Sequence, residues 1–277
     1  MVHNYHVTAT NWNQATDTLA KLVRLPGFGL FSDLDGTLAP IAPTPHAAHI
    51  SPRTRELLAA LGAELPVLAL ISGRRAASLA DKVGLPGLSY IGNHGLERWE
   101  HGQTVVLPEA EPYLPQLQAV KKELEPLQQD GAFVEDKQVT LSFHYRQAPR
   151  PAEFARQHAA QIEELVAGHG LVLFRGKMVF EVRPPIEMDK GVEFSRLVQE
   201  RRLQAALFLG DDISDLNALR TARRLRVEKV CEAWGVGVQS EDAPADLAAT
   251  ADFLADGVAD VEELLAWLLA ARKASST

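Results

Sequence analysis

Two aspartates one residue apart, Asp33 and Asp35, are the first side chains in the sequence whose types and spacing could do chemistry. Carboxylates held this close repel each other unless a cation or a proton lies between them. Ligands that offer only oxygen favour a hard metal ion such as Mg²⁺. Gly36 permits a tight turn, and Thr37 offers a hydroxyl group and an N–H group to an anion. An ordinary Asp-Gly turn is the alternative, because both residues are common in turns.

A second acidic cluster, formed by Asp211, Asp212 and Asp215, lies further along the chain. Aspartates at the start of a helix are stabilised by the helix dipole, and this structural alternative explains one or two of them better than three. Lys190 precedes the cluster and could bring its positive charge to a phosphate group or to Asp33. It could equally be a surface lysine in the first turn of a helix.

Groups that could bind a phosphate follow two other apolar runs. Ser72, Gly73 and Arg74 precede a helical pattern, and the free N–H groups at a helix N-terminus suit an anion. An ordinary strand-to-helix turn with a capping serine is the alternative. His94 stands in a glycine-bounded turn and could be a simple turn residue. We favour a ligand contact for it, because it follows the end of a strand.

The elements that must position these groups are short apolar runs, which alternate with helical patterns. The runs occupy residues 28–32, 66–71, 88–91, 205–209, 235–238 and 251–254. Helical patterns cover residues 11–24, 52–63, 190–202 and 258–271, and another ends near Val83. This alternation predicts an α/β fold with a Rossmann-like core and a parallel sheet. Because side chains alternate along a strand, we expect Asp33 and Asp35 to point to the same side.

A different pattern begins near residue 103 and ends at Pro184 and Pro185. We expect strands at 105–107, 131–134, 139–145, 171–174 and 178–182, and helices at 114–125 and 153–167. Antiparallel hairpins are expected, with residues 175–177 in the last turn. This αββαββ-like order predicts an inserted α+β domain. We expect a core of residues 1–103 and 186–277 and a cap of residues 104–185.

The insert carries an unusual set of polar side chains on or beside its expected strands. They are Glu135, Lys137, His144, Arg146, Lys177 and Glu181. Even spacing puts Glu135 with Lys137, and Lys177 with Glu181, on one face of a regular strand. Such a face could hold a polyol through charged hydrogen bonds. The alternative is a solvated sheet face with cross-strand ion pairs. Without the rest of the chain, we favour this alternative over a polyol site.

Composition restricts the class of protein. The 277 residues are 46% hydrophobic, which allows a sizeable core, and the net charge of −8 disfavours nucleic acid or an anionic membrane as a partner. The one cysteine, Cys231, allows no intrachain disulfide, which fits a reducing cytosol. The N-terminus lacks the pattern of a secretory signal, and the apolar segments are too short to span a bilayer. We expect a cytoplasmic monomer.

In this order, the polar groups of the core resemble the four motifs of the haloacid dehalogenase-like phosphatase superfamily. The motifs are 33–37 (DLDGT), 72–74 (SGR), Lys190 and 210–215 (GDDISD). The insert between the second and third motifs resembles the C2-type cap of that superfamily. Similarity to trehalose-6-phosphate phosphatases is found at 33–41 (DLDGTLAPI), 92–95 (GNHG), 135–137 (EDK), 144–146 (HYR), 176–177 (GK) and 181–184 (EVRP). Leu34, Leu216 and Asn217 depart from that family, which often has tyrosine and acidic residues there.

The resemblance implies a Mg²⁺-dependent phosphatase for a sugar phosphate, trehalose 6-phosphate. Asp33 would be the nucleophile, Asp35 the general acid and base, and Ser72 and Lys190 would hold the phosphoryl group. The implied metal ligands are Asp33, Asp35, Asp211 and Asp215. The implied substrate contacts are Gly73, Arg74, His94, Glu135, Lys137, His144, Arg146, Lys177 and Glu181. The alternatives are a phosphatase for another sugar phosphate, of the sucrose or glucosylglycerate type, and a non-catalytic sugar-phosphate sensor.

Overall fold

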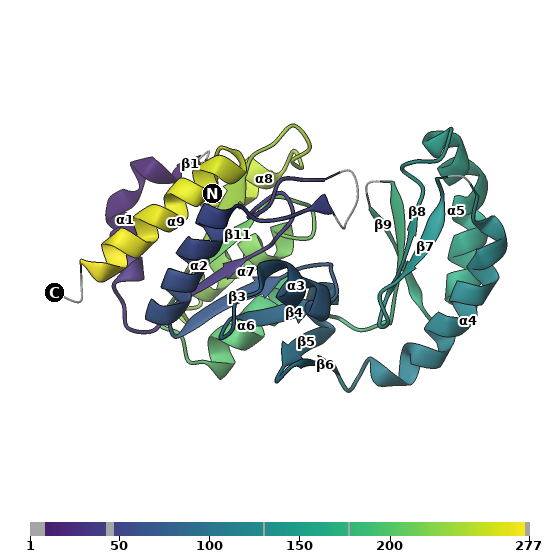
Figure 1. The fold of residues 1–277 in the computed structure, drawn as a ribbon, viewed down its shortest axis with the longest axis horizontal. Coiled ribbons are helices and arrows are strands. Elements are labelled where there is room, and N and C mark those ends of the chain that lie inside the picture. The colour runs from purple at the N-terminus through teal and green to yellow at the C-terminus, as the bar shows by residue number, and fades with distance from the viewer. Residues whose placement is uncertain (1–8, 43–46, 130, 177, 275–277) are drawn as a thin grey trace, which may run out of the picture. The chain divides into compact units, whose positions relative to one another are not determined.

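The computed structural model describes residues 9–42, 47–129, 131–176 and 178–274. The chain forms two compact units, Met1–Gln103 with Met188–Thr277 and, between them in sequence, Thr104–Glu187. We call these the first unit and the inserted unit, and the colour bar of Figure 1 identifies their elements. Among the helices described, none combines the length and the apolar character needed to cross a membrane.

The first unit is built on a sheet that has nine strands over the described residues. From edge to edge they are β1 (Thr10–Asn11), β13 (Phe253–Ala255), β12 (Glu232–Val238), β11 (Ala205–Gly210), β2 (Phe28–Ser32), β3 (Val67–Ile71), β4 (Ser89–Gly92), β5 (Glu97–Glu100) and β6 (Gln103–Val106). The outer strand β6 continues into the first residues of the stretch assigned to the inserted unit. The strand expected over residues 105–107 is therefore part of this sheet and not of the antiparallel sheet described below. All neighbours from β1 to β4 pair in parallel, and β5 runs antiparallel to β4. The α/β fold with a parallel sheet, expected from the sequence, is confirmed.

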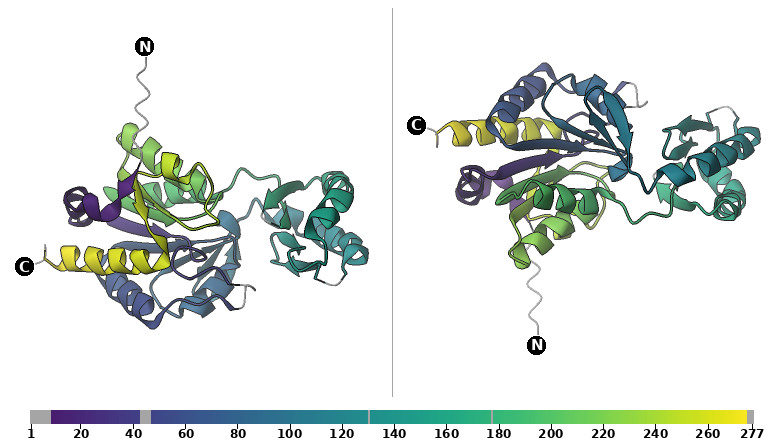
Figure 2. Two further views of the ribbon diagram at one scale, coloured as in Figure 1. Left: turned by 90° about the horizontal axis from the view of Figure 1, so that it is seen from above. Right: turned by 90° about the horizontal axis from the view of Figure 1, so that it is seen from below.

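Helices cover both faces of this sheet, as Figure 2 shows. One layer consists of α1 (Thr16–Val23), α2 (Pro52–Glu64), α3 (Ala76–Val83) and α9 (Gly257–Lys273). The other consists of α6 (Lys190–Glu200), α7 (Leu216–Val227) and α8 (Leu247–Thr250). In the central strand β2, Leu30 packs in the core of the first layer and Phe31 in that of the second. Burial on both faces explains why the strands read as continuous apolar runs.

Strand register brings the polar segments to one edge of the sheet. Ser32, the last residue of β2, lies opposite Leu209 of β11 and Leu70 of β3. The N–H of Asp33 then donates to the carbonyl oxygen of Leu209 at 2.9 Å. The segments that follow β2, β3 and β11 therefore meet beyond the carboxyl ends of three neighbouring strands, where ligands bind in open α/β sheets.

Local structure differs from expectation at two places in the first unit. The helix expected over residues 11–24 begins at Thr16, because β1 pairs with β13 and Trp12 starts a 3₁₀ turn. The buried indole of Trp12 donates its Nε1–H to Asp260 at 3.0 Å, which fixes this bend. The strand β5, sequence ERWE, is not expected from its charged residues and forms through antiparallel pairing with β4.

The inserted unit has an antiparallel sheet in the order β7 (Phe133–Asp136), β8 (Leu141–His144), β10 (Val179–Arg183) and β9 (Val172–Gly176). Its core joins one face of the sheet to α4 (Leu114–Leu124) and α5 (Pro151–Gly168). We expected residues 175–177 to form a turn, but Arg175 and Gly176 still belong to β9 and pair with β10. The strand is therefore longer, and the turn shorter, than expected. Lys177 lies outside the described residues.

Candidate active site

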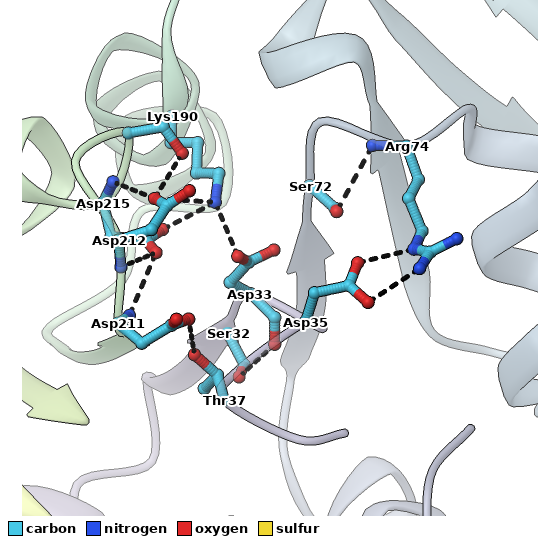
Figure 3. Close-up of polar contacts among 11 residues, drawn as sticks. Ser32, Asp33, Asp35, Thr37, Ser72, Arg74, Lys190, Asp211, Asp212 and Asp215 are labelled. Carbon is cyan, nitrogen blue, oxygen red and sulfur yellow. Dashed lines mark hydrogen bonds and ion pairs between the residues drawn. The ribbon is translucent and has the colours of Figure 1, made fainter. Parts of the chain in front are cut away.

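The ammonium group of Lys190 lies among three carboxylates at the strand-end edge of the first unit (Figure 3). Its Nζ is 2.8 Å from Oδ2 of Asp33, 2.8 Å from Oδ1 of Asp215 and 3.9 Å from Oδ1 of Asp212. Lys190 is the first residue of α6, where Asp189 caps the helix by accepting from the N–H of Val192 at 2.8 Å. Because the lysine is only 1% exposed, the surface-lysine alternative is wrong.

Asp215 holds both this lysine and the loop that carries the other acids. Its Oδ2 accepts from the backbone N–H groups of Asp211 and Asp212, each at 3.1 Å, while its Oδ1 accepts from Lys190. A Cβ atom on Gly210 would lie 2.4 Å from the Asp215 carboxyl carbon, so glycine is required there. The third acid of the cluster therefore has a structural role in this loop.

Asp211 contacts the loop that follows Asp35. The hydroxyl of Thr37 donates to Oδ1 of Asp211 at 2.9 Å, so this hydroxyl orients a carboxylate. Gly36 has φ +79°, and a Cβ atom there would lie 2.0 Å from Oδ2 of Asp211. This close approach and the left-handed backbone both require glycine. The Asp-Gly turn thus connects the two acidic clusters.

Asp33 and Asp35 point in different directions, as Figure 3 shows, so the expectation that they share a side is wrong. The physical reason is that β2 ends at Ser32 and the chain then turns, so strand alternation no longer applies. Asp35 accepts from Nε of Arg74 at 2.5 Å and from Nη2 of Arg74 at 2.7 Å. This two-pronged ion pair joins the aspartate loop to the loop after β3.

The loop of residues 72–75, after β3, does not have the capping pattern considered from the sequence. The buried hydroxyl of Ser72 accepts from the N–H of Arg74 at 3.3 Å. At the start of α3, the N–H of Ala76 donates to Oε1 of Glu97 at 2.6 Å, so this helix N-terminus already has an anionic partner. Glu97 was not among the expected site residues, and only its place just after the GNHG turn could have drawn attention to it.

His94 packs against the same loop. It is 8% exposed, and its backbone N–H donates to the carbonyl oxygen of Ser72 at 2.9 Å. A Cβ atom on Gly73 would lie 2.7 Å from Nε2 of His94, so the ring lies directly over this glycine. The expected substrate residues Gly73, Arg74 and His94 therefore form one packed group with Ser72.

Burial and charge shift the pKa values of the acidic cluster. Burial raises the pKa of Asp33 to about 6, since it outweighs the attraction of Lys190. Burial, with the charges of Asp33 and Asp212, raises the pKa of Asp211 to about 7. Burial would also raise the pKa of Asp212, but Lys190 and the hydrogen bonds from Ser214 and Asp215 lower it to about 2. Burial opposes the charge of Lys190, but the neighbouring acids raise its pKa well above the usual value.

Three acids at this edge could supply oxygen ligands to a divalent metal ion, which would share them with the ammonium group of Lys190. Carboxylate oxygens of Asp33, Asp212 and Asp215 lie within 4.8 Å of one another. Among the described residues, Oδ1 of Asp33 is buried and has no hydrogen-bond partner, which is the state expected of a ligand atom. This group includes Asp212, which was not an expected ligand, while Asp211 lies nearby with its Oδ1 bound to Thr37. Oxygen ligands of this kind suit a hard cation.

Three members of the expected charged set, Glu135, His144 and Glu181, lie on the face of the inserted unit's sheet that is opposite the helices. Glu135 and Glu181 are both paired with Ser142 of β8, so they share this face. Nε2 of His144 is 2.8 Å from Oε2 of Glu135, and Nζ of Lys137 is 3.9 Å from Oε1 of Glu181. Arg183, absent from the expected set, donates to Oε2 of Glu181 at 2.5 Å. Arg146 is exposed beyond the end of β8.

Comparison with known proteins agrees with this geometry. The model of the family described as trehalose-phosphatase matches residues 31–250. A trehalose-phosphate phosphatase of Mycobacterium tuberculosis is 34% identical over 199 residues, which are 68% of this chain and 50% of the relative. The chain thus spans about half the length of the curated relatives it matches.

Solved structures show the same fold. The trehalose-6-phosphate phosphatase of Aspergillus fumigatus is 29% identical with a TM-score of 0.63, covering 95% of this chain and 99% of that one. The C-terminal domain of the Candida albicans trehalose-6-phosphate phosphatase is 22% identical with a TM-score of 0.76 and the same coverage. A haloacid dehalogenase-like hydrolase from Bacteroides thetaiotaomicron is 18% identical with a TM-score of 0.57, covering 86% and 98%. The expected haloacid dehalogenase-like fold is confirmed.

Proposed function

Because this chain belongs to the trehalose-phosphatase family, we propose that it hydrolyses trehalose 6-phosphate to trehalose and inorganic phosphate. The observation that carries the proposal is the buried pair of Asp33 and Lys190, 2.8 Å apart, at the ligand-binding edge of the sheet. A carboxylate with a free oxygen can attack phosphorus, and a fixed ammonium group can stabilise the phosphoryl oxygens.

In the first proposed step, an Asp33 oxygen bonds to phosphorus while the phosphorus–oxygen bond to the sugar breaks. The leaving sugar oxygen takes the electron pair of that bond and a proton from Asp35. Ser72 and Lys190 hold the phosphoryl oxygens as their charge redistributes. The products of this step are the free sugar and an aspartyl-phosphate on Asp33.

In the second proposed step, Asp35 takes a proton from a water molecule, whose oxygen attacks the phosphorus of the aspartyl-phosphate. The bond between Asp33 and phosphorus breaks, inorganic phosphate leaves, and the Asp33 carboxylate is restored. Asp35 thus acts first as an acid and then as a base, which returns it to its starting state.

We propose Mg²⁺ as the cofactor of this site. Asp33, Asp211 and Asp215 are the side chains expected to hold it, with the Asp35 carbonyl oxygen, and the geometry adds Asp212. When bound, the ion would neutralise carboxylates that otherwise repel a phosphate dianion and would polarise the phosphoryl group.

We propose that the first unit is catalytic and that the inserted unit recognises the sugar. Two acids, Glu135 and Glu181, and two bases, Lys137 and Arg183, balance the charge of its sheet face, which suits an uncharged polyol. His144, Arg146 and Lys177 remain proposed contacts of the same kind. A cytoplasmic location also remains a proposal, supported by the single, unpaired Cys231.

The test is phosphate release from trehalose 6-phosphate, glucose 6-phosphate, sucrose 6-phosphate and p-nitrophenyl phosphate, with Mg²⁺ and with a chelator. We expect metal-dependent release with a strong preference for trehalose 6-phosphate. Asp33→Asn should abolish turnover and leave the fold intact, because the amide is a poor nucleophile. Preference for another sugar phosphate would overturn the sugar assignment, and release by pure Asp33→Asn would overturn the nucleophile. Binding without release would favour a sensor.

A further inference from the structure

The loop of residues 72–75 is held by a turn that comes after the next strand. The N–H of Asn93 donates to the carbonyl oxygen of Arg74 at 2.7 Å, and the N–H of His94 donates to that of Ser72 at 2.9 Å. The N–H of Ser72 in turn donates to the carbonyl oxygen of Ile91 at 3.0 Å. These bonds fix the backbone of the loop that carries two proposed active-site side chains.

This supporting turn is strained and closely fitted. Asn93 and His94 both have left-handed backbone angles, with φ of +48° and +58°. Such residues cost on the order of 1 kcal/mol or more each, and they persist where the surroundings determine them. A Cβ atom on Gly92 would lie 2.2 Å from the nitrogen of Ala76 and 2.7 Å from the oxygen of Arg74. The backbone at Gly92, where the turn begins, therefore packs directly against the start of α3.

Glu97 completes this support. Its side chain comes from β5, which pairs with β4, is 1% exposed, and accepts the N–H of Ala76 at 2.6 Å. A carboxylate at a helix N-terminus is stabilised by the helix dipole, and it satisfies a donor that would otherwise be unpaired. We propose that Glu97 is a positioning residue, which holds the start of α3 and thereby sets Ser72 and Arg74 in the active site.

This inference rests on the proposed phosphatase function. Removing the carboxylate frees the N–H of Ala76, two residues from Arg74, whose guanidinium holds Asp35. A displacement of about 1 Å in a positioning group can lower a rate by on the order of 100-fold. Loss of Glu97 should therefore lower kcat, although Glu97 is not proposed to contact the substrate.

Three variants and one control separate positioning from simple stability. Glu97→Ala removes the acceptor, Glu97→Gln keeps its reach without the charge, and Glu97→Asp keeps the charge without the reach. The control is Asp252→Ala, since Asp252 is also a poorly exposed carboxylate that accepts a backbone N–H, that of Gly235 at 3.0 Å. Its ion pair is with Arg226, outside the proposed catalytic set.

We would measure kcat and KM for trehalose 6-phosphate and p-nitrophenyl phosphate, thermal unfolding, and amide hydrogen exchange of residues 72–76. Glu97→Ala should lower kcat by about 10- to 100-fold and speed exchange in 72–76, with a smaller change in KM. Glu97→Gln should keep more activity than Glu97→Asp, because the glutamine side chain is long enough to accept the N–H of Ala76, whereas the aspartate side chain is one carbon shorter. Asp252→Ala should lower the melting temperature without either effect.

Wild-type kcat and exchange in folded Glu97→Ala would overturn the inference, leaving Glu97 only a stabilising role. If Glu97→Ala does not fold, equal activity of Glu97→Gln and Glu97→Asp, or a higher kcat in Glu97→Asp, would overturn it instead. Failure of the wild type to release phosphate from any ester would refute the proposed function, whereas the exchange data would still test whether Glu97 holds the loop.

Discussion

At the scale of single residues, the acids of the site are not equivalent. Asp33 has a buried oxygen without a described partner, Asp215 is engaged by Lys190 and two backbone N–H groups, and Asp35 is ion-paired with Arg74. These differences in partner, more than the presence of carboxylates, are the reason for proposing Asp33 as the nucleophile and a structural role for Asp215.

Asp211→Asn should make unfolding less dependent on pH. The pKa of Asp211 is raised from its usual 3.8 to about 7 in the folded protein. Between these values the folded state holds a proton that the unfolded state has lost, so the free energy of unfolding falls as pH rises. Because asparagine cannot ionise, this fall in the free energy of unfolding should be absent in Asp211→Asn. In the presence of chelator, the melting temperature of Asp211→Asn should therefore be higher than that of the wild type at pH 8, and this difference should disappear near pH 4.

At pH 8, the free energy of unfolding of Asp211→Asn should exceed that of the wild type by on the order of 1–3 kcal/mol. Each unit of pKa shift corresponds to about 1.4 kcal/mol, and neighbouring acids share the effect. The exposed Asp17 provides a control, because Asp17→Asn lies at the surface of α1. A gap that stays constant from pH 4 to pH 8 would contradict the assigned pKa shift.

The effect of Arg74→Gln on kcat should depend on the leaving group of the substrate. Arg74 holds Asp35, the proposed acid that protonates the sugar oxygen, whereas nitrophenolate leaves without a proton. We expect kcat on trehalose 6-phosphate to fall by about 10- to 100-fold, and on p-nitrophenyl phosphate by less than about 5-fold. Arg53→Gln, at an exposed ion pair with Glu263, is the control. An equal rise in KM for both substrates would instead mean that Arg74 binds phosphate.

The sequence predicts which residues gather at the site better than it predicts how they are paired. Asp33, Ser72 and Asp211 follow directly from the rule that parallel strands end at one edge. The Arg74–Asp35 pair and the Glu97 contact depend on turn conformations after β2 and β4, including two left-handed residues that no periodicity indicates.

At the scale of elements, buried strands and capped helices were predictable because their signals are local. The start of α2, for example, has a capping serine, Ser51, and a proline in the first turn, Pro52, and both are signals that can be read from the sequence. β1 and β5 were not predictable, because one has only two residues and the other has a charged sequence. Both owe their strand form to pairing with a neighbour, and that pairing is a tertiary effect.

Ser51→Ala should weaken the start of α2. The Ser51 hydroxyl accepts from the N–H of Thr54 at 2.9 Å and also contacts Glu262 of α9. Loss of such a cap costs about 1 kcal/mol of unfolding free energy, measurable by urea denaturation. Ser78→Ala, within α3, is the matched control and should be neutral or stabilising, since alanine favours helix interiors. Equal effects of the two variants would show that the cap contributes nothing.

At the scale of the whole molecule, net charge should influence the approach of the substrate. The chain carries a net charge of −8, and the proposed substrate carries a phosphate dianion, so their long-range interaction should be repulsive. Raising ionic strength from about 0.01 M to 0.15 M shortens the screening length from about 30 Å to 8 Å. At saturating Mg²⁺, kcat/KM should therefore rise by roughly 2- to 3-fold while kcat stays constant. A fall in kcat/KM would mean that local cations dominate.

The order of the strands has a consequence for the protein as it is synthesised. β2 pairs with β3, made soon after it, and with β11, which the ribosome makes only after the entire inserted unit. Until β11 emerges, one edge of β2 lacks its partner, and unpaired edges invite wrong pairing. The inserted unit has its own core and is complete in sequence earlier. Asp33, the proposed nucleophile, is thus translated early, but its site can assemble only near the end of translation.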